Sequence, residues 1–180
     1  MVNRKNVAMV FVLVLLLSLL AGCVAQPVQM PEREVPVTME EAMAAQQAGM
    51  EGLATGSATF TEAELSSFLT EMIQQNGGGT VPVDQVTTYF NDDGTIAIDI
   101  QLTPGTVPGI DSVGLVGKVD VEDGRVKTEL SQAGAGPISV TGPMLQLVQG
   151  MINRALDDPS LGVAVAVDVS DGEMMVSLAQ

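Results

Sequence analysis

Side chains capable of acid–base or nucleophilic chemistry are scarce in this chain. Its 180 residues include no His and a single Cys, Cys23. Histidine is the commonest general base and metal ligand near neutral pH, and a Cys thiolate is the usual sulfur nucleophile. Without His, the Ser/His/Asp and Cys/His arrangements of nucleophilic catalysis are excluded.

The acidic side chains add little chemistry. Glu40-Glu41 and Asp157-Asp158 are adjacent pairs, and neighbours in sequence do not face each other on a helix, so we interpret both pairs as solvated surface. The stretch 91–94 (Asn-Asp-Asp-Gly) has some oxygen ligands of a calcium loop but lacks the spaced ligands and the closing Glu, and a hairpin turn is favoured. We therefore expect a protein that is not an enzyme, with no catalytic residue, no metal and no cofactor.

The single thiol ends the only long apolar run, in the stretch Leu20-Ala21-Gly22-Cys23. Residues 1–22 begin with Arg4-Lys5 and continue with an uncharged stretch and small residues, which is the layout of a cleaved secretory signal. The stretch from Leu20 to Cys23 resembles the lipobox of bacterial lipoproteins, in which the Cys is lipidated and becomes the mature N-terminus. The resemblance implies a protein of the cell envelope, held on the extracytoplasmic side of a bacterial membrane by a lipid anchor at Cys23.

Two other interpretations of this segment are weaker. A membrane-spanning helix needs roughly 20 apolar residues, and the uncharged run from Val7 to Leu20 is shorter. A lone Cys is usually a buried free thiol, but the position of Cys23 directly after Leu, Ala and Gly favours lipidation.

The charge of the chain excludes one class of partner. Removal of Arg4 and Lys5 with the leader leaves 5 basic against 22 acidic residues, a formal charge of −17. Such a chain is repelled by phosphate backbones, so nucleic acid is not expected as a partner. Membrane contact is expected through the lipid anchor rather than through charge.

The segment after the anchor is predicted to be a spacer followed by a helix. Residues 23–37 contain three Pro residues, a composition typical of an extended, poorly packed linker. Thr38 is a predicted N-cap with Glu41 three residues later, and the helix is expected to run to about Met50. We expect a single domain over 38–180.

The strongest local signal begins at Phe60. Thr61 and Glu64 have the spacing of a capping box, and Phe60 can pack on Leu65 as a hydrophobic staple, so a helix is predicted to begin here. It is expected to end at the glycines 77–79. Its apolar positions follow helical spacing and are Leu65, Phe68, Leu69, Met72 and Ile73.

Three Asp-Gly pairs, at 93–94, 123–124 and 171–172, predict three hairpins. Asp-Gly favours turns in which both central residues have positive φ. The flanking runs alternate: Ile96, Ile98, Ile100 and Leu102 share one side, and the same pattern recurs in 113–121, 126–130 and 163–169.

A second amphipathic helix is predicted to begin at Pro143 and to end before Pro159. Strands with one apolar face need a cover. The sequence therefore predicts an α+β fold, with one antiparallel sheet of about six strands in three hairpins and two amphipathic helices covering one face.

The remaining candidate site is apolar. Met is abundant, with 11 residues, while aromatic residues make up 3%, and flexible thioether side chains suit adaptable surfaces as well as ordinary cores. A cleft between helices and sheet would suit an acyl chain. The candidate ligand-facing residues are Leu65, Phe68, Leu69, Met72, Met144, Val148, Met151 and Ile152.

Three stretches, 61–65 (Thr-Glu-Ala-Glu-Leu), 93–96 (Asp-Gly-Thr-Ile) and 142–145 (Gly-Pro-Met-Leu), resemble small extracytoplasmic proteins of the YpmS-like and TULIP-like type. The TULIP resemblance implies binding of lipid or another apolar ligand between a helix and a curved sheet. We therefore expect a non-catalytic binder of lipid or of another hydrophobic ligand. The alternative is an envelope interaction or assembly module that binds a protein partner and no small molecule.

Overall fold

The computed structural model describes residues 28–76, 82–136, 138–156 and 164–178. In these residues the chain forms three helices and two antiparallel sheets, and the predicted α+β class is confirmed. The predicted signal peptide, the stretch from Leu20 to Cys23 and the glycines 77–79 lie outside the described residues. The elements are α2 (Met39–Thr55), β1 (Ser57–Thr61), α3 (Glu62–Asn76), β2 (Val83–Phe90), β3 (Thr95–Leu102), β4 (Ser112–Glu122), β5 (Arg125–Ala135), β6 (Ile138–Val140), α4 (Pro143–Leu156), β7 (Ala164–Ser170) and β8 (Glu173–Leu178).

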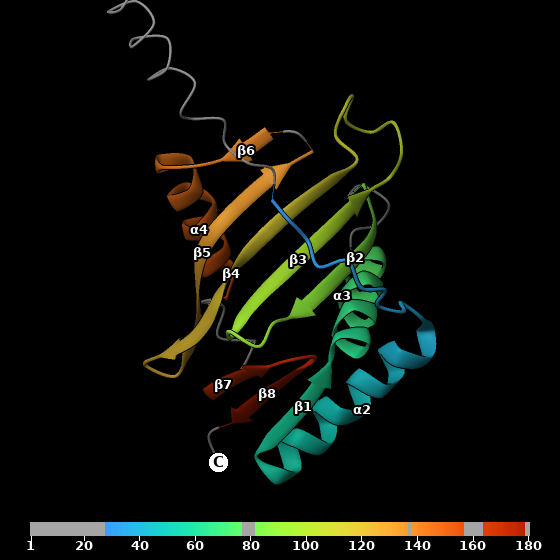
Figure 1. The fold of residues 1–180 in the computed structure, drawn as a ribbon. Helices are drawn as coiled ribbons and strands as arrows, with labels where there is room; N and C mark the ends of the chain where they lie inside the picture. Colours follow the sequence, from blue (N-terminus) through green and yellow to red (C-terminus); the bar gives the residue numbers. More distant parts are fainter. Residues whose placement is uncertain (1–27, 77–81, 137, 157–163, 179–180) are drawn as a thin grey trace, which may run out of the picture.

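The strands form two sheets rather than the predicted single sheet. One sheet has five strands in the order β2-β3-β4-β5-β6, and the other has three strands in the order β1-β8-β7 (Figure 1). The third predicted hairpin, β7–β8, belongs to a different sheet from the first two hairpins. In that sheet β8 pairs with β1, and Phe60 lies opposite Met174. The single-sheet prediction is wrong because it did not include β1. Strand β1 has five residues and ends directly before α3. Phe60, predicted to precede the helix, is therefore paired within the β1–β8 ladder.

The helix starts are as predicted. Thr61 N donates to Glu64 Oε2 at 2.8 Å, and Glu64 N donates to Thr61 Oγ1 at 3.2 Å, which is a reciprocal capping box. The side chain of Thr38 accepts a hydrogen bond from Glu41 N at 3.2 Å. The helix that Thr38 caps runs past the predicted end at Met50 to Thr55.

The hairpin turns agree with the prediction in part. Asp123 and Gly124 both have positive φ, 52° and 75°, as a type I′ turn requires. At the other two turns only the glycine does, with φ of 76° at Gly94 and 79° at Gly172. In the first of them, Asp93 instead accepts a hydrogen bond from Thr95 N at 2.9 Å, so the carboxylate closes the turn.

Helix α3 is fixed to the edge of the five-stranded sheet by a stripe of polar side chains, spaced four residues apart. Four residues of a helix rise about 6 Å, and two residues of a strand rise about 6.6 Å. Successive side chains of the stripe therefore meet alternate residues of β2. The bonds are Phe90 N to Glu62 Oε1 (2.6 Å), Thr88 N to Ser66 Oγ (2.8 Å), Val86 N to Thr70 Oγ1 (2.9 Å) and Gln74 Nε2 to Asp84 O (2.8 Å).

Helix α4 closes the opposite side of the sheet in the same way. The strand β6 pairs only with residues 133–135 of β5. Beyond that point, Leu130 N donates to Gln149 Oε1 at 3.1 Å, and Thr128 N donates to Asn153 Oδ1 at 2.8 Å. Both helices therefore satisfy exposed strand edges, which otherwise favour aggregation.

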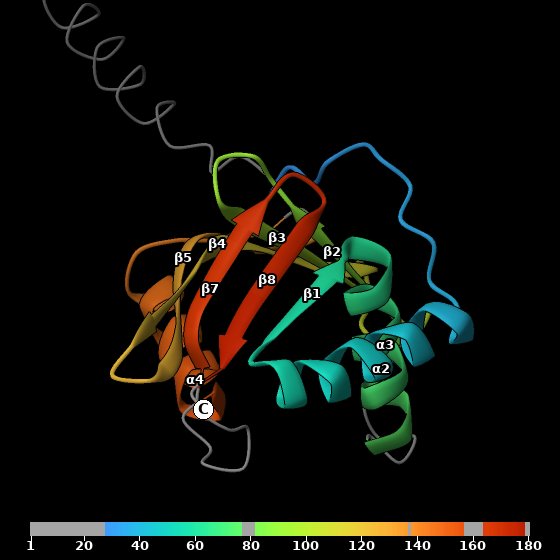
Figure 2. The ribbon, with the colours of Figure 1, turned by 90° about the horizontal axis from the view of Figure 1, so that it is seen from below.

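The helices flank the sheet, and the prediction that two helices alone cover one face is corrected. Figure 2 shows the three-stranded sheet between α4 on one side and α2 with α3 on the other. Strands β7 and β8 thus cover the middle of the face.

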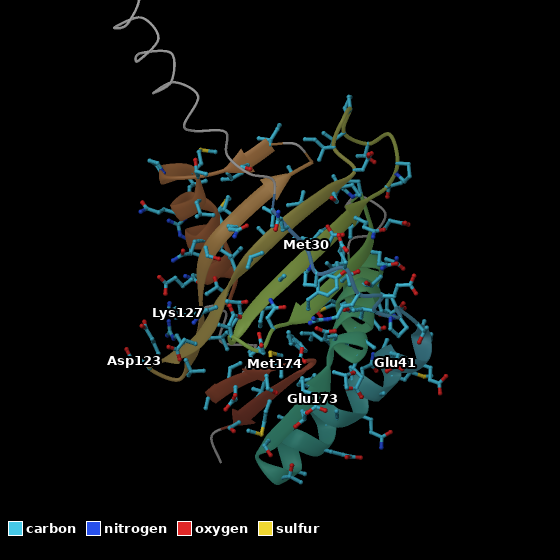
Figure 3. All side chains as sticks on the ribbon, viewed as in Figure 1. Met30, Glu41, Asp123, Lys127, Glu173 and Met174 are labelled. Atoms are coloured by element: carbon cyan, nitrogen blue, oxygen red, sulfur yellow. The ribbon has the colours of Figure 1, made fainter. Side chains whose placement is uncertain are left out.

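Residues 28–37, the described part of the predicted linker, form no helix or strand but lie on the other face of the five-stranded sheet (Figures 1 and 3). A Cβ atom at Gly114 would lie 2.5 Å from Met30 Cε, so the glycine leaves room for this segment. Arg33 Nε donates to Glu62 Oε2 at 3.1 Å, and Arg33 Nη2 donates to Phe90 O at 2.8 Å. The hydrogen bond to Glu62 raises the pKa of Arg33 above its ordinary value. These residues are packed on the domain, unlike the free spacer that their composition suggested.

Candidate apolar ligand site

A cavity of about 300 Å³ lies between the five-stranded sheet and the β7–β8 hairpin. Its walls come from α3, β2 to β5, α4, β7 and β8. All but three of the lining residues are hydrophobic or glycine: Leu65, Leu69, Thr88, Ile96, Ile98, Leu115, Gly117, Lys118, Val119, Val126, Thr128, Leu130, Ile152, Val167, Met174 and Val176.

The sheet wall consists of alternate residues on three neighbouring strands. Ile98 of β3 is paired with Leu115 of β4, and Val119 of β4 is paired with Thr128 of β5. Because strand side chains alternate between faces, these residues point to the same side. The predicted alternation of the hairpin arms therefore holds on all three strands.

Gly117 lies in the middle of this wall at an irregular point of the β4–β5 ladder. A Cβ atom there would lie 2.5 Å from Glu129 O and 3.0 Å from Leu130 Cα. Glycine is therefore required by the close approach of the two backbones, and it adds no side chain to the cavity.

The polar groups beside the cavity already have partners. Thr88 Oγ1 lies 3.0 Å from Ser66 Oγ, and Thr128 Oγ1 donates to Asn153 Oδ1 at 2.8 Å. Lys118 is exposed and is paired with Glu129, between the cavity-facing residues Gly117 and Val119, so its side chain is directed to the other face. A bound molecule would therefore meet hydrocarbon almost everywhere.

The most closely packed part of the core lies at one side of the cavity. Among the described residues, the largest fully buried side chains are Phe90, Thr88 and Ser66, where α3 meets β2. By contrast, Leu115, Val119 and Val176 are only half-buried. The two sheets therefore enclose apolar surface that their own side chains do not fill.

Three of the eight candidate ligand-facing residues line this cavity, namely Leu65, Leu69 and Ile152. The other five do not: Phe68 and Val148 are half-buried elsewhere, and Met72, Met144 and Met151 are 40%, 60% and 54% exposed. Most of the cavity wall comes instead from the apolar sides of strands, which the alternating sequence predicts but does not place against a cavity.

The acidic pairs predicted to lie on the surface are placed only in part by the structure. Glu40 is exposed and Glu41 half-buried in the first turn of α2, while 157–158 lie outside the described residues. Hydrogen bonds from Thr95 hold the pKa of Asp93 below its ordinary value, which fits a turn residue. Within the described ranges, no group of three His, Cys, Asp or Glu side chains is arranged to hold a metal ion.

A larger hollow of about 690 Å³ lies between the β4–β5 hairpin and α4. Its lining is mixed and mostly polar or charged, including Asp120, Glu122 and Lys127. It offers no apolar enclosure, so the smaller cavity is the better candidate site for an apolar ligand.

None of α2, α3 and α4, the helices of the described segments, is long and apolar enough to cross a membrane. Comparisons of the chain with protein-family models, with curated proteins and with solved structures find no match.

Proposed function

We propose that this protein is a lipid-anchored lipoprotein of the bacterial cell envelope that binds a hydrophobic ligand without chemical conversion. The observation that carries the proposal is the cavity of about 300 Å³ with its apolar lining. Small-molecule sites are typically concave and mostly apolar, with volumes of roughly 300–1,000 Å³. This cavity is at the lower end of that range.

The ligand class follows from the size and polarity of the cavity. Because Thr88 and Thr128 use their hydroxyl groups within the protein, the buried part of a ligand would gain no hydrogen bond and should carry no charge. A single alkyl chain fits these conditions, with any polar head group left in water. Binding would then depend on burial of apolar surface, at about 25 cal/mol per Å².

The proposed location rests on the leader. The stretch from Leu20 to Cys23 resembles a lipobox, and a lipidated Cys23 would tether the domain outside the membrane. The resemblance of residues 61–65, 93–96 and 142–145 to TULIP-like proteins supports an apolar ligand.

Native mass spectrometry of residues 24–180 tests the proposal. All helices and strands described lie within this range, and it lacks the lipidated Cys. Added long-chain alcohols or phospholipids are expected to bind with a stoichiometry of one. Val167→Asp, which places a charge in the apolar cavity wall, should abolish this binding, whereas Val107→Asp, at a loop residue that is 37% exposed, should not. No bound lipid on the unaltered protein, or equal binding by both variants, would contradict the proposal.

The alternative function, an envelope interaction module without a small-molecule ligand, is favoured by a different observation. Exposed apolar side chains gather on α2 and α4, and they include Met43, which is 57% exposed, and Met144, which is 60% exposed. Exposed apolar patches often mark docking surfaces.

A further inference from the structure

The outer face of α2 carries a regular apolar stripe. Met39, Met43, Met50 and Leu53 are 56%, 57%, 65% and 76% exposed. With the exposed Gln46 at the centre, their spacing alternates between four and three residues, which is the seam of a coiled coil. The buried residues of the helix are small and lie beside the stripe or further round the helix, namely Ala42, Ala45 and Gly52.

A matching stripe lies on α4. Met144, Leu147 and Met151 are 60%, 56% and 54% exposed, and the next position in the three–four pattern is Arg154. Gln149 and Asn153, which bind β5, lie on the other side of the helix. The stripe is therefore not used within the described fold.

The two helices that carry these stripes differ in the sign of their charge. Helix α2 contains Glu40, Glu41 and Glu51 and no Lys or Arg. Helix α4 contains no acidic residue and carries Arg154 in its last turn. Pairing α2 with a second α2 would place acidic residues together, whereas pairing α2 with α4 brings Arg154 beside acidic residues.

The two helices lie on opposite sides of the molecule, with the three-stranded sheet between them (Figure 2). They cannot meet within one molecule. We propose that α2 of one copy docks antiparallel on α4 of a second copy, with their apolar stripes packed as in a two-helix coiled coil. This orientation places Met43 opposite Met151 and Arg154 near Glu40. This contact is independent of ligand binding in the cavity.

The geometry determines the kind of assembly. Each contact uses α2 of one molecule and α4 of another, so it is head-to-tail and leaves one free α2 and one free α4 in every dimer. Assembly therefore continues to larger species as the concentration rises. One pair of short helices buries less area than a standard interface, so each contact is weak, and the net negative charge opposes it at low ionic strength.

Disulfide trapping tests the pairing directly. Residues 24–180 contain no Cys, so Met43→Cys and Met151→Cys each introduce a unique thiol in a different stripe. When the two variants are mixed, one of them carrying a mass tag, and mildly oxidised at physiological salt, the disulfide between positions 43 and 151 should exceed both homodimers by about tenfold. Equal amounts of all three dimers, a dominant homodimer or no disulfide would overturn the proposal.

Sedimentation velocity gives a second measurement that needs no disulfide. The unaltered protein should form species larger than a monomer as its concentration rises, and Met43→Lys or Leu147→Glu should each abolish them. The matched control Val107→Lys, at an exposed loop residue, should leave them unchanged. A monomer at every concentration, or one closed dimer, would contradict head-to-tail assembly.

Discussion

Removal of one hydroxyl group at Ser66 should destabilise the fold strongly. Ser66 is fully buried, and its Oγ accepts a hydrogen bond from Thr88 N at 2.8 Å and lies 3.0 Å from Thr88 Oγ1. In Ser66→Ala, the amide of Thr88 loses its partner in a place that water does not reach. A buried unsatisfied donor costs about 1–3 kcal/mol, and Thr88 Oγ1 keeps only a weak bond, 3.4 Å from Glu62 O.

We therefore expect Ser66→Ala to lower the free energy of unfolding by about 2–3 kcal/mol. For a domain of this size, that corresponds to a fall in Tm of roughly 4–12 °C. Urea unfolding and calorimetry of residues 24–180 measure both quantities. Gln74→Ala is the control, because it removes the last member of the same stripe at an exposed position and should cost less than about 0.5 kcal/mol. If Ser66→Ala were as stable as this control, the stripe would not hold the strand edge.

Three further predictions concern the strand and helix contacts. Burial raises the pKa of Asp99, so folding favours its protonated form, and the stability of the fold falls as the pH rises above about 3.9. Asp99→Asn should therefore raise Tm at pH 7 but not at pH 3, which calorimetry at both pH values measures. A Cβ atom at Gly52 would lie 2.6 Å from the Cβ of Ala58, whereas a Cβ atom at Gly49 would have nothing within 4 Å. In urea unfolding, Gly52→Ala should therefore lower the free energy of unfolding by about 1–2 kcal/mol, and Gly49→Ala should raise it by up to about 1 kcal/mol. Arg33→Ala should cost about 1–2 kcal/mol in the same assay, because Glu62 loses its charged partner, and an unchanged midpoint would show that residues 28–37 do not stabilise the domain.

The parts of the fold that depend on local interactions follow from the sequence. The capping box of Thr61 and Glu64 joins residues three apart, and the turn at 123–124 is determined by its own two residues. Neither needs information from distant parts of the chain. Strand β1 has no such local signal, because this five-residue strand is paired with β8 at the far end of the chain.

Apolar periodicity also hid how the helices attach. Ser66 and Thr70 lie among the apolar residues of α3 and have helical spacing of their own, yet a search for apolar faces passes over them. Their role depends on the amides of β2 at a matching spacing, which no sequence pattern displays. The composition of the proline-rich segment predicts a free linker, but the segment packs on the sheet because glycines in β4 and β5 leave room for Val28 and Met30.

The candidate site was predictable as a type of surface but not as a place. Leu65, Leu69 and Ile152 were identified because helical faces are easy to recognise. Met144 and Met151 have equally suitable spacing, but they face outward because the amide side chains of Gln149 and Asn153 turn the opposite side of α4 to the sheet. Either side of α4 could therefore face the sheet as far as apolar spacing shows. The hydrogen bonds of Gln149 and Asn153 to β5 determine which side does.

The central claim, that an alkyl chain occupies the cavity between the two sheets, is tested most directly by fluorescence quenching. The chain contains no Trp, so a single introduced Trp reports on its own position. Leu69→Trp places the reporter in the cavity wall, and Met72→Trp places it at a 40% exposed position of the same helix. A long-chain alcohol carrying bromine on its alkyl chain should quench Leu69→Trp saturably and leave Met72→Trp almost unchanged. Equal quenching of both, or no quenching of either, would contradict the proposed binding site.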